Sequence, residues 1–280
     1  MGRYFGGIDI GSTMTKIVIM DDDVVAKVIG PTGAEHRHLA NKVMEEALQQ
    51  AQIAFEEVAY IVATGYGRIN VPFADRQITE ITCHARGVST LFPSARTVID
   101  IGGQDAKGIK ITKGKVTNFV MNDKCAAGTG RFLEVIAEAL ELKLEDIGDL
   151  SLKAQSKAKI SNTCTIFAEQ EVVSNIADGV PIEDILAGLH ASIASRVYRM
   201  AERVKIERDV VLTGGVAINV GMVKALEDQL GYSILVPEEP LLTGAIGAAI
   251  LGKERVLKSL EKGETIERKE RRLEAAKFFE

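Results

Sequence analysis

Apolar runs of strand length, separated by polar turns, open the chain. Residues 4–10, 16–20 and 24–29 form three such runs, and the breaks fall at Gly11 and at the aspartates 21–23. Short apolar runs broken by Gly, Ser, Thr and Asp are typical of hairpins. We therefore expect the chain to begin with a hairpin that has a polar, glycine-led turn at its head.

Further strands and helices are predicted along the rest of the chain. Apolar runs predict strands over 58–64, 97–101, 209–212 and 233–237. Apolar residues at every third or fourth position predict helices over 39–51, from 79 onward, after 130, over 182–205, from 215 to 226 and over 244–250. The polar stretch 142–160 is also predicted to be helical.

The strand at 97–101 starts a second copy of the N-terminal pattern. GIDIGSTMTKIVI and VIDIGGQDAKGIKI share an apolar–Ile–Asp–Ile–Gly strand, a small polar turn and a returning strand with Lys and Ile. Two copies of one hairpin indicate a duplicated fold. Turns of this kind can present N–H groups to phosphate, and each copy has one acid at its strand end, Asp9 or Asp100. We expect two lobes that hold a polyphosphate between their turns.

Two of the three cysteines stand in front of predicted helices. Cys125 lies in NDKCAAGTGRFLE, where a glycine turn leads into a helix, and Cys164 lies in SNTCTIFAEQEVVS, behind residues that favour helix N-caps. Helix N-termini favour negative charge, so they stabilise a thiolate or a thiolate-bound metal. For a cysteine taken alone, a buried and inert side chain is the alternative.

Two other patterns carry candidate chemistry. Thr213-Gly214-Gly215 follows a buried strand and opens a helix, which lets the backbone approach a flat or phosphate-bearing ligand closely. Glu80 and His84 share one helix face at i,i+4. They could form a site, although a mutually supporting pair on the helix surface is the commoner arrangement.

Composition narrows the class of function. The chain has 280 residues, 46% of them hydrophobic, with a net charge of −5 and a pI near 5.6, which argues against a nucleic-acid surface. No apolar run approaches the ~20 residues that span a bilayer, and the N-terminus lacks a signal-peptide pattern, so we expect no membrane contact and a cytoplasmic location. In that compartment, an odd number of cysteines favours metal or redox roles over disulfides.

Longer motifs connect the chain to a family. DIGS, DIGG and TGGV, in that order, resemble the phosphate-1, phosphate-2 and adenosine motifs of the acetokinase, sugar kinase, Hsc70 and actin superfamily. With KCAAGTGRFLE, NTCTIFAEQEVVS, DIGGQDAK and LLTGAIGAA, the run 7–252 resembles the ATPase activators (component A) of 2-hydroxyacyl-CoA dehydratases. These belong to the BadF/BadG/BcrA/BcrD-type ATPases, which include relatives from benzoyl-CoA reductases.

The resemblance implies a fold and a domain division. The implied fold is a duplicated actin-like (ribonuclease H-like) α/β fold with the nucleotide in the cleft between two lobes. The expected lobes are 1–92, completed by a helix around 240–260, and 93–240, which carries the two cysteines. Beyond the family pattern, the alternating Lys, Arg and Glu residues over 253–280 predict a charged, solvated helical extension or a frayed tail.

The function implied by the resemblance is ATP-dependent delivery of one low-potential electron to a dehydratase in anaerobic metabolism, with ferredoxin or flavodoxin as the donor. Members of this family are homodimers with one [4Fe–4S] cluster on the twofold axis, held by two cysteines from each subunit. Carried over by position, these are Cys125 and Cys164, and Cys83 would be structural. Four thiolates are the usual complement of such a cluster, and a twofold axis doubles two into four.

The expected nucleotide site draws on both repeats. Asp9 and Asp100 would hold Mg²⁺ through water, and Gln104 is the candidate for orienting the water that attacks ATP. The other expected contacts to ATP or ADP are Gly11, Ser12, Thr13, Lys16, Gly102 and Gly103 at the phosphates, and Gly214, Gly215 and Asn219 near the adenosine.

Other functions fit the same fold. A sugar-type small-molecule kinase, such as an N-acetylglucosamine kinase, would need an acid at the substrate hydroxyl, and Gln104 beside Asp100 favours hydrolysis instead. The ATPase subunit of a benzoyl-CoA reductase-like system and a non-enzymatic nucleotide switch are the remaining alternatives.

Overall fold

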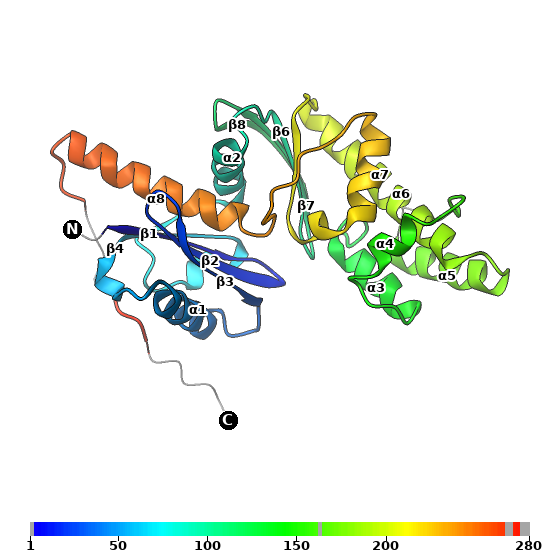
Figure 1. The fold of residues 1–280 in the computed structure, drawn as a ribbon, viewed down its shortest axis with the longest axis horizontal. Coiled ribbons are helices and arrows are strands. Elements are labelled where there is room, and N and C mark those ends of the chain that lie inside the picture. The colour runs from blue at the N-terminus through cyan, green and yellow to red at the C-terminus, as the bar shows by residue number, and fades with distance from the viewer. Residues whose placement is uncertain (1–2, 162–163, 267–270, 275–280) are drawn as a thin grey trace. The chain divides into compact units, whose positions relative to one another are not determined.

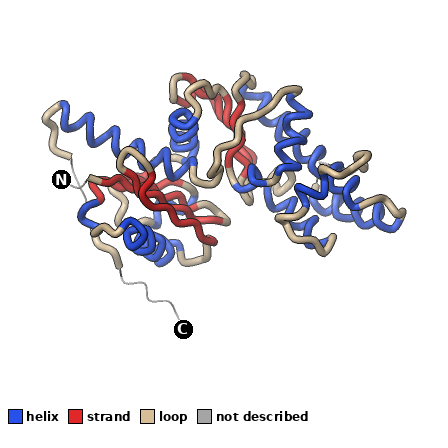
Figure 2. The backbone as a smooth tube through the Cα atoms, in the orientation of Figure 1, coloured by secondary structure: helices blue, strands red, loops and turns tan. Residues whose placement is uncertain are grey.

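The computed structural model describes residues 3–161, 164–266 and 271–274. They fall into two compact units (Figure 1). Each unit is built on its own β-sheet flanked by helices (Figure 2). Unit 1 comprises Met1–Pro93, Lys113–Lys115 and Leu241–Glu280, and unit 2 comprises Ser94–Thr112 and Val116–Pro240.

Unit 1 contains a five-stranded sheet in the order β3-β2-β1-β4-β5. The apolar side chains on one face of the sheet pack against α1 and those on the other face against α8, and the two helices lie on opposite sides of the strands in Figure 1. The elements of unit 1 are β1 (Tyr4–Ile10), β2 (Met14–Met20), β3 (Val24–Pro31), α1 (His36–Ala51), η1 (Phe55–Glu57), β4 (Val58–Thr64), η2 (Tyr66–Asn70), β5 (Arg76–Gln77), α2 (Glu80–Leu91) and α8 (Thr243–Glu261).

Unit 2 contains a four-stranded sheet in the order β8-β7-β6-β9. One hydrophobic cluster joins this sheet to the helices of the unit, with Phe132 of α3 fully buried in it. The elements of unit 2 are β6 (Thr97–Ile101), β7 (Ala106–Thr112), β8 (Lys115–Asn122), α3 (Gly130–Ala139), α4 (Ile147–Ser151), α5 (Thr165–Ala177), α6 (Ile182–Ala201), η3 (Glu202–Val204), β9 (Val210–Thr213), η4 (Gly215–Ile218) and α7 (Val220–Leu230).

The two sheets repeat one topology. β1 pairs antiparallel with β2 and parallel with β4, and β6 pairs antiparallel with β7 and parallel with β9. The register is also repeated, because Asp9 lies opposite Lys16 and Asp100 lies opposite Lys107. The duplication predicted from the two Asp-Ile-Gly strands is therefore confirmed, and with it the α/β fold.

Two predicted elements are wrong. The stretch 142–160 contains only the short helix α4, because its later part is held as a loop by Asp184, whose carboxylate accepts hydrogen bonds from the backbone N–H groups of Gln155 and Ser156 (2.9 and 3.0 Å). The strand predicted over 233–237 is reduced to one bridge, between Leu235 and Val211.

In the C-terminal charged stretch α8 ends at Glu261, and the described residues beyond it, 262–266 and 271–274, lie outside any helix. The rest of the predicted extension, 267–270 and 275–280, lies outside the described residues. Arg271 is buried rather than solvent-exposed: its guanidinium donates to the Asp75 carboxylate at 3.1 Å and to the carbonyl of Val58 at 2.8 Å, and it lies over the ring of Phe55. The exposed fractions of the two charged side chains are 9% for Arg271 and 0% for Asp75. Arg271 is thus held against Asp75, Val58 and Phe55, which corrects the expectation of a solvated side chain at this position.

Removal of the Arg271 charge is expected to destabilise unit 1. In Arg271→Met, the carboxylate of Asp75 stays buried without its counter-charge, which costs about 3–5 kcal/mol of unfolding free energy. Urea denaturation measures this loss. The control is Arg3→Met, which breaks a pair with Asp21 on a side chain that is 75% exposed and should change the midpoint little. Equal effects of the two substitutions would show that the buried pair does not anchor the tail.

His190 of α6 gives unit 2 a pH-dependent stability. Its ring is 1% exposed, Nδ1 lies 2.8 Å from the carbonyl oxygen of Leu186, and burial lowers the pKa from 6.5 to about 4. Between these two pH values the unfolded chain binds a proton that the folded chain does not, so the stabilisation is complete above about pH 6.5 and is lost as the pH falls toward 4.

Lowering the pH from 7 to 5 should therefore cost about 2 kcal/mol through His190. Urea denaturation of the native sequence and of His190→Asn at both pH values isolates this contribution, because the other titrating groups are common to both. The His190→Asn protein should lose less stability on acidification. An identical pH dependence in the two proteins would rule out the neutral, buried histidine.

Candidate functional site

The first candidate element is the carboxylate turn between β1 and β2, in unit 1. Asp9 is 5% exposed at the end of β1, and Lys16 Nζ lies 3.3 Å from its Oδ2 atom. The N–H of Gly11 donates to the carbonyl of Met14 at 3.1 Å, which closes the turn. A carboxylate and an ammonium are thereby fixed beside a tight backbone turn.

A second carboxylate turn, between β6 and β7 in unit 2, repeats this geometry. Lys107 Nζ lies 3.3 Å from Asp100 Oδ2, and the N–H of Gly102 donates to the carbonyl of Asp105 at 2.9 Å. Thr213 donates its hydroxyl to Asp100 Oδ1 at 2.9 Å. Sequence reasoning missed Lys107 as a member of the site, although its place seven residues after Asp100 matches that of Lys16 after Asp9.

The strand that pairs in parallel with β1 or β6 ends beside the corresponding carboxylate turn. β4 ends at Thr64 and β9 at Thr213, and each is followed by a glycine with positive φ, Gly65 at 81° and Gly214 at 86°. A Cβ atom on either glycine would lie 2.4 Å from the last carbonyl oxygen of β1 or β6. Only glycine fits at these two positions. The sequences VATGYG and VLTGGV share a Thr-Gly pair, and this similarity could have predicted the role of Gly65.

The two carboxylate turns differ in the number of acids that surround the lysine. Lys107 pairs with two buried carboxylates, Asp100 and Asp105, and its side chain is 4% exposed. Lys16 forms an ion pair with Asp9, and its side chain is 12% exposed. Met14 occupies the position in the first turn that Asp105 occupies in the second. Lys16 is therefore the better placed of the two ammonium groups to meet a phosphate, and Lys107 serves to hold the two acids.

The other predicted phosphate contacts lie at or beside the turns. Ser12 and Thr13 are partly exposed, and the carbonyl of Thr13 accepts from the N–H of Thr32 at 2.7 Å. Gly103 is partly exposed and Gln104 is exposed. The structure thus leaves these side chains and backbone groups accessible to a ligand, and their roles in binding ATP stay predictions.

The Thr-Gly-Gly turn lies at the end of β9. Gly215 is exposed, and two apolar side chains beyond it, Ile218 and Val220, are 61% and 46% exposed. Asn219 accepts the N–H of Met222 at 2.9 Å and so caps α7. This cap accounts for the asparagine without a nucleotide, and the prediction that Asn219 lies near an adenosine is not tested by it.

The three cysteines have different surroundings. Cys83 is fully buried, and burial raises the pKa of its thiol to about 12, so it stays protonated and inert. Cys125 and Cys164 are partly exposed, and the helices that follow them, α3 and α5, pack against each other. Cys164 lies at the N-terminus of α5, as predicted, and is itself the N-cap residue.

Cys125 lies before the glycine turn that leads into α3, as the motif predicted. α3 starts at Gly130, with Thr129 as its N-cap, and the residues between form a separate turn. In this turn Asn122 donates its side-chain amide to the carbonyl of Cys125 at 2.9 Å, and Gly128 has a φ of 92°. The predicted glycine turn is therefore present, and it separates Cys125 from the first residue of α3.

The beginning of α3 is bonded to the second carboxylate turn. The N–H groups of Gly130 and Arg131 donate to the carbonyls of Gly102 and Gly103, both at 2.8 Å. A Cβ atom on Gly130 would lie 3.2 Å from the carbonyl oxygen of Gly102 and 3.2 Å from Val216. The loop that carries Cys125 is therefore tied to the turn that carries Asp100.

Glu80 and His84 are not a surface pair. They are 9% and 6% exposed, Glu80 lies 3.5 Å from Arg68, and His84 Nδ1 lies 2.9 Å from the hydroxyl of Thr243. The face of α2 that they share packs against α8, which the i,i+4 spacing alone could not reveal.

Comparison with known proteins decides the family. The model of the BadF/BadG/BcrA/BcrD ATPase family matches residues 7–252. The chain belongs to this ATPase family. It is 47% identical over 258 residues to an activator of lactoyl-CoA dehydratase from Anaerotignum propionicum, covering 91% of this chain and 99% of that protein.

Two crystal structures of members of the BadF/BadG/BcrA/BcrD family share the fold. The Acidaminococcus fermentans (R)-2-hydroxyglutaryl-CoA dehydratase component A is 46% identical, with a TM-score of 0.88 over 91% of this chain and 99% of that one. The Clostridium difficile activator of 2-hydroxyisocaproyl-CoA dehydratase, with bound ADPNP, is 44% identical, with a TM-score of 0.87 over 94% and 99%. The predicted family and its actin-like fold are thus confirmed.

Within 3–161, 164–266 and 271–274, no cluster of three or more His, Cys, Asp or Glu side chains is arranged to hold a metal ion. In the same described part of the chain, no helix is long and apolar enough to cross a membrane.

Proposed function

We propose that the chain hydrolyses ATP and, with an iron–sulfur cluster, delivers single low-potential electrons to a 2-hydroxyacyl-CoA dehydratase. The observation that carries the proposal is the hydrogen-bonded junction of Gly102 and Gly103 with the start of α3, which ties a carboxylate turn to the Cys125 loop. Through these hydrogen bonds, a nucleotide-dependent change at the turn would be transmitted directly to the thiols. Relatives that are 46–47% identical are activators of dehydratases, and this supports a dehydratase as the electron acceptor.

The nucleotide is proposed to bind at the two carboxylate turns. Asp9 and Asp100 would hold Mg²⁺ through water, a donor set that suits this cation. Lys16 would contact a phosphate together with the N–H groups of the Gly11 and Gly103 turns. Gln104, which is exposed beside Asp100, would orient the attacking water. The base would lie on the exposed apolar surface of Ile218 and Val220 beyond Gly214 and Gly215.

The thiols fit a cluster that two chains share. A [4Fe–4S] cluster requires four thiolates and supplies one-electron chemistry when bound. Cys83 is excluded by its burial and raised pKa, so one chain offers two ligands, Cys125 and Cys164. A second copy related by a twofold axis would provide the other two.

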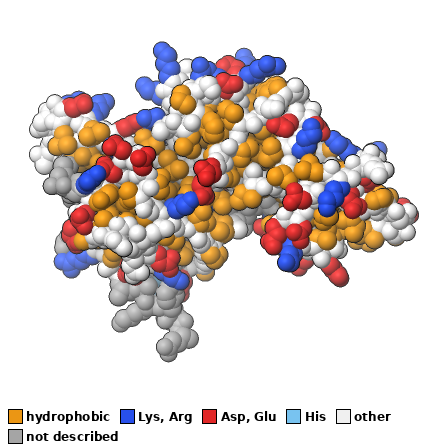
Figure 3. Space-filling view, in the orientation of Figure 1, with side chains coloured by type: hydrophobic (Ala, Val, Ile, Leu, Met, Phe, Trp, Pro, Cys, Tyr) orange, Lys and Arg blue, Asp and Glu red, His pale blue; other side chains and the backbone are white. Residues whose placement is uncertain are grey.

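The surface beside Cys164 supports such a dimer. Four apolar side chains of α5 are exposed by 43–63%, and hydrophobic atoms gather over this helix in Figure 3. They are Ile166, Phe167, Val173 and Ile176. Apolar groups concentrated on one helix face of a protein indicate an interaction surface. We propose that the second copy covers it.

The direct test of the proposed function is an anaerobic turnover assay with reduced ferredoxin or flavodoxin as donor and a 2-hydroxyacyl-CoA dehydratase as acceptor. The proposal expects ATP hydrolysis without any added sugar, and dehydratase activity that requires ATP. ADP release that depends on a sugar, with no ATP-dependent activation, would instead identify a small-molecule kinase. ATP-dependent reduction of an aromatic acyl-CoA would point to a benzoyl-CoA reductase-like system.

A further inference from the structure

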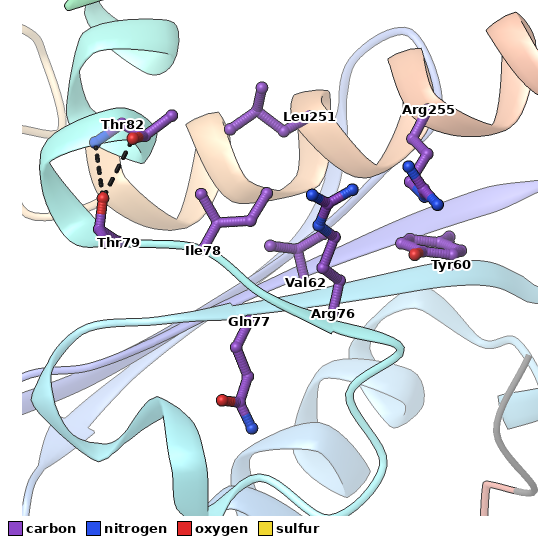
Figure 4. A pocket seen from close by; sticks show the side chains of 9 residues that line it. All are labelled: Tyr60, Val62, Arg76, Gln77, Ile78, Thr79, Thr82, Leu251 and Arg255. Carbon is purple, nitrogen blue, oxygen red and sulfur yellow. Dashed lines mark hydrogen bonds between the residues drawn. The ribbon is translucent and has the colours of Figure 1, made fainter.

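Unit 1 contains a cavity that the nucleotide and cluster proposals do not use. It has a volume of about 390 Å³ and lies among β4, β5, α2 and α8 (Figure 4). Small-molecule sites in proteins are usually concave regions of about 300–1,000 Å³. β5 is a two-residue edge strand, so the sheet stops short here and leaves the side of α8 uncovered.

Two arginines stand at this cavity. Arg76 is the first residue of β5 and Arg255 belongs to α8, and Figure 4 shows both guanidinium groups on the same side of the cavity. Both residues are exposed. Neither has a carboxylate partner among the residues that the structure describes.

The acids in the neighbouring sequence are already paired. Asp75 binds Arg271, Glu80 binds Arg68 and Glu254 binds Arg86. Among the described residues, these two like charges therefore converge without a compensating carboxylate. An anion between them would relieve their repulsion and accept charge-assisted hydrogen bonds from both guanidinium groups.

The rest of the wall is largely apolar. Tyr60, Val62, Ile78 and Leu251 line it, with the hydroxyl-bearing Thr79 and Thr82 at one end. In Figure 4 the side chain of Gln77 points away from the two arginines. The cavity thus combines a cationic rim with an apolar floor.

We propose that this cavity binds a small molecule that carries an oxyanion, a carboxylate or a phosphate, on an apolar body. The oxyanion would lie between Arg76 and Arg255, and the apolar body would cover Val62 and Leu251. The site is separate from both carboxylate turns and from the cysteines, and it does not depend on the proposed function.

Isothermal titration calorimetry of the full chain tests this site with three probes of similar shape: phenylacetate, phenyl phosphate and the neutral phenylacetamide. At least one of the two anions should bind, and the amide should bind about 10-fold more weakly or not at all. Binding of phenylacetate alone identifies the ligand class as carboxylates, and binding of phenyl phosphate alone identifies it as phosphates.

Three variants locate the binding. Arg76→Gln and Arg255→Gln should each weaken binding of the anion about 10-fold, because each loses one charge-assisted contact. Lys258→Gln is the control, since it removes an exposed charge from the same helix without touching the cavity. The inference is overturned if neither anion binds, if the amide binds as tightly as the anions, or if both arginine variants retain full affinity.

Discussion

Cys125→Ser and Cys164→Ser are each expected to abolish iron–sulfur cluster assembly while the protein still folds and binds nucleotide. Four thiolates complete a [4Fe–4S] cluster, and a serine hydroxyl does not replace one at neutral pH. Because a twofold axis uses every position twice, one substitution removes two of the four ligands. The loss should therefore be complete and not partial.

Cys83→Ala is the matched control for these substitutions. Its thiol is fully buried with a pKa of about 12, and it lies in unit 1 under α8. Iron and sulfide content after anaerobic purification, with ADP binding measured in parallel, should be unchanged in this variant. A full cluster in Cys125→Ser or Cys164→Ser, or its loss in Cys83→Ala, would show that the ligands are assigned incorrectly.

Asp100→Asn is expected to lower the rate of ATP hydrolysis by about 100- to 1,000-fold, the usual cost of removing one electrostatic group from a reacting centre. Asparagine keeps an oxygen for the hydroxyl of Thr213, and Lys107 keeps Asp105 as its partner. The fold should therefore survive while the charge that would hold Mg²⁺ is lost. Phosphate release at saturating Mg·ATP measures the effect.

Asp105→Asn distinguishes a role in hydrolysis from a role in folding. It removes the other carboxylate that Lys107 contacts and leaves Asp100 in place. Its rate should fall much less than that of Asp100→Asn. Equal losses in the two variants would mean that the network acts only by holding unit 2 together, and an unchanged rate in Asp100→Asn would remove this residue from the site.

The repeated hairpin was predictable because its signal is local. The Asp-Ile-Gly strands, the glycine turns and the return strands lie within 13 or 14 consecutive residues, and the observed register places Asp9 against Lys16 and Asp100 against Lys107. The same locality explains why the placement of Cys164 at a helix N-terminus was correct.

Features that depend on distant partners were not predictable. The burial of Arg271 requires Asp75, which is 196 residues away in the sequence, and composition alone favours a solvated arginine. Glu80 and His84 are buried because α8 covers their helix, although their spacing also suits an exposed face. The loop in the later part of 142–160 is held by hydrogen bonds to Asp184, which lies well beyond it in the sequence.

The partition of roles between Lys16 and Lys107 lies between these extremes. Both lysines are visible in the repeat, yet only the structure shows that Asp105 adds a second carboxylate beside Lys107 and that Met14 takes the equivalent place in the first turn. A duplicated pattern thus predicts where the site is, and the packing around each copy decides what each copy can do.

Native mass spectrometry of the anaerobically purified protein, combined with iron and sulfide analysis, tests most directly the claim that two chains share one cluster. We predict a brown protein whose mass is that of two chains with four irons and four sulfides between them. We also predict that it separates into single chains when the cluster is removed by a chelator under oxidising conditions. A colourless protein without iron, or a single chain that holds four irons by itself, would contradict it.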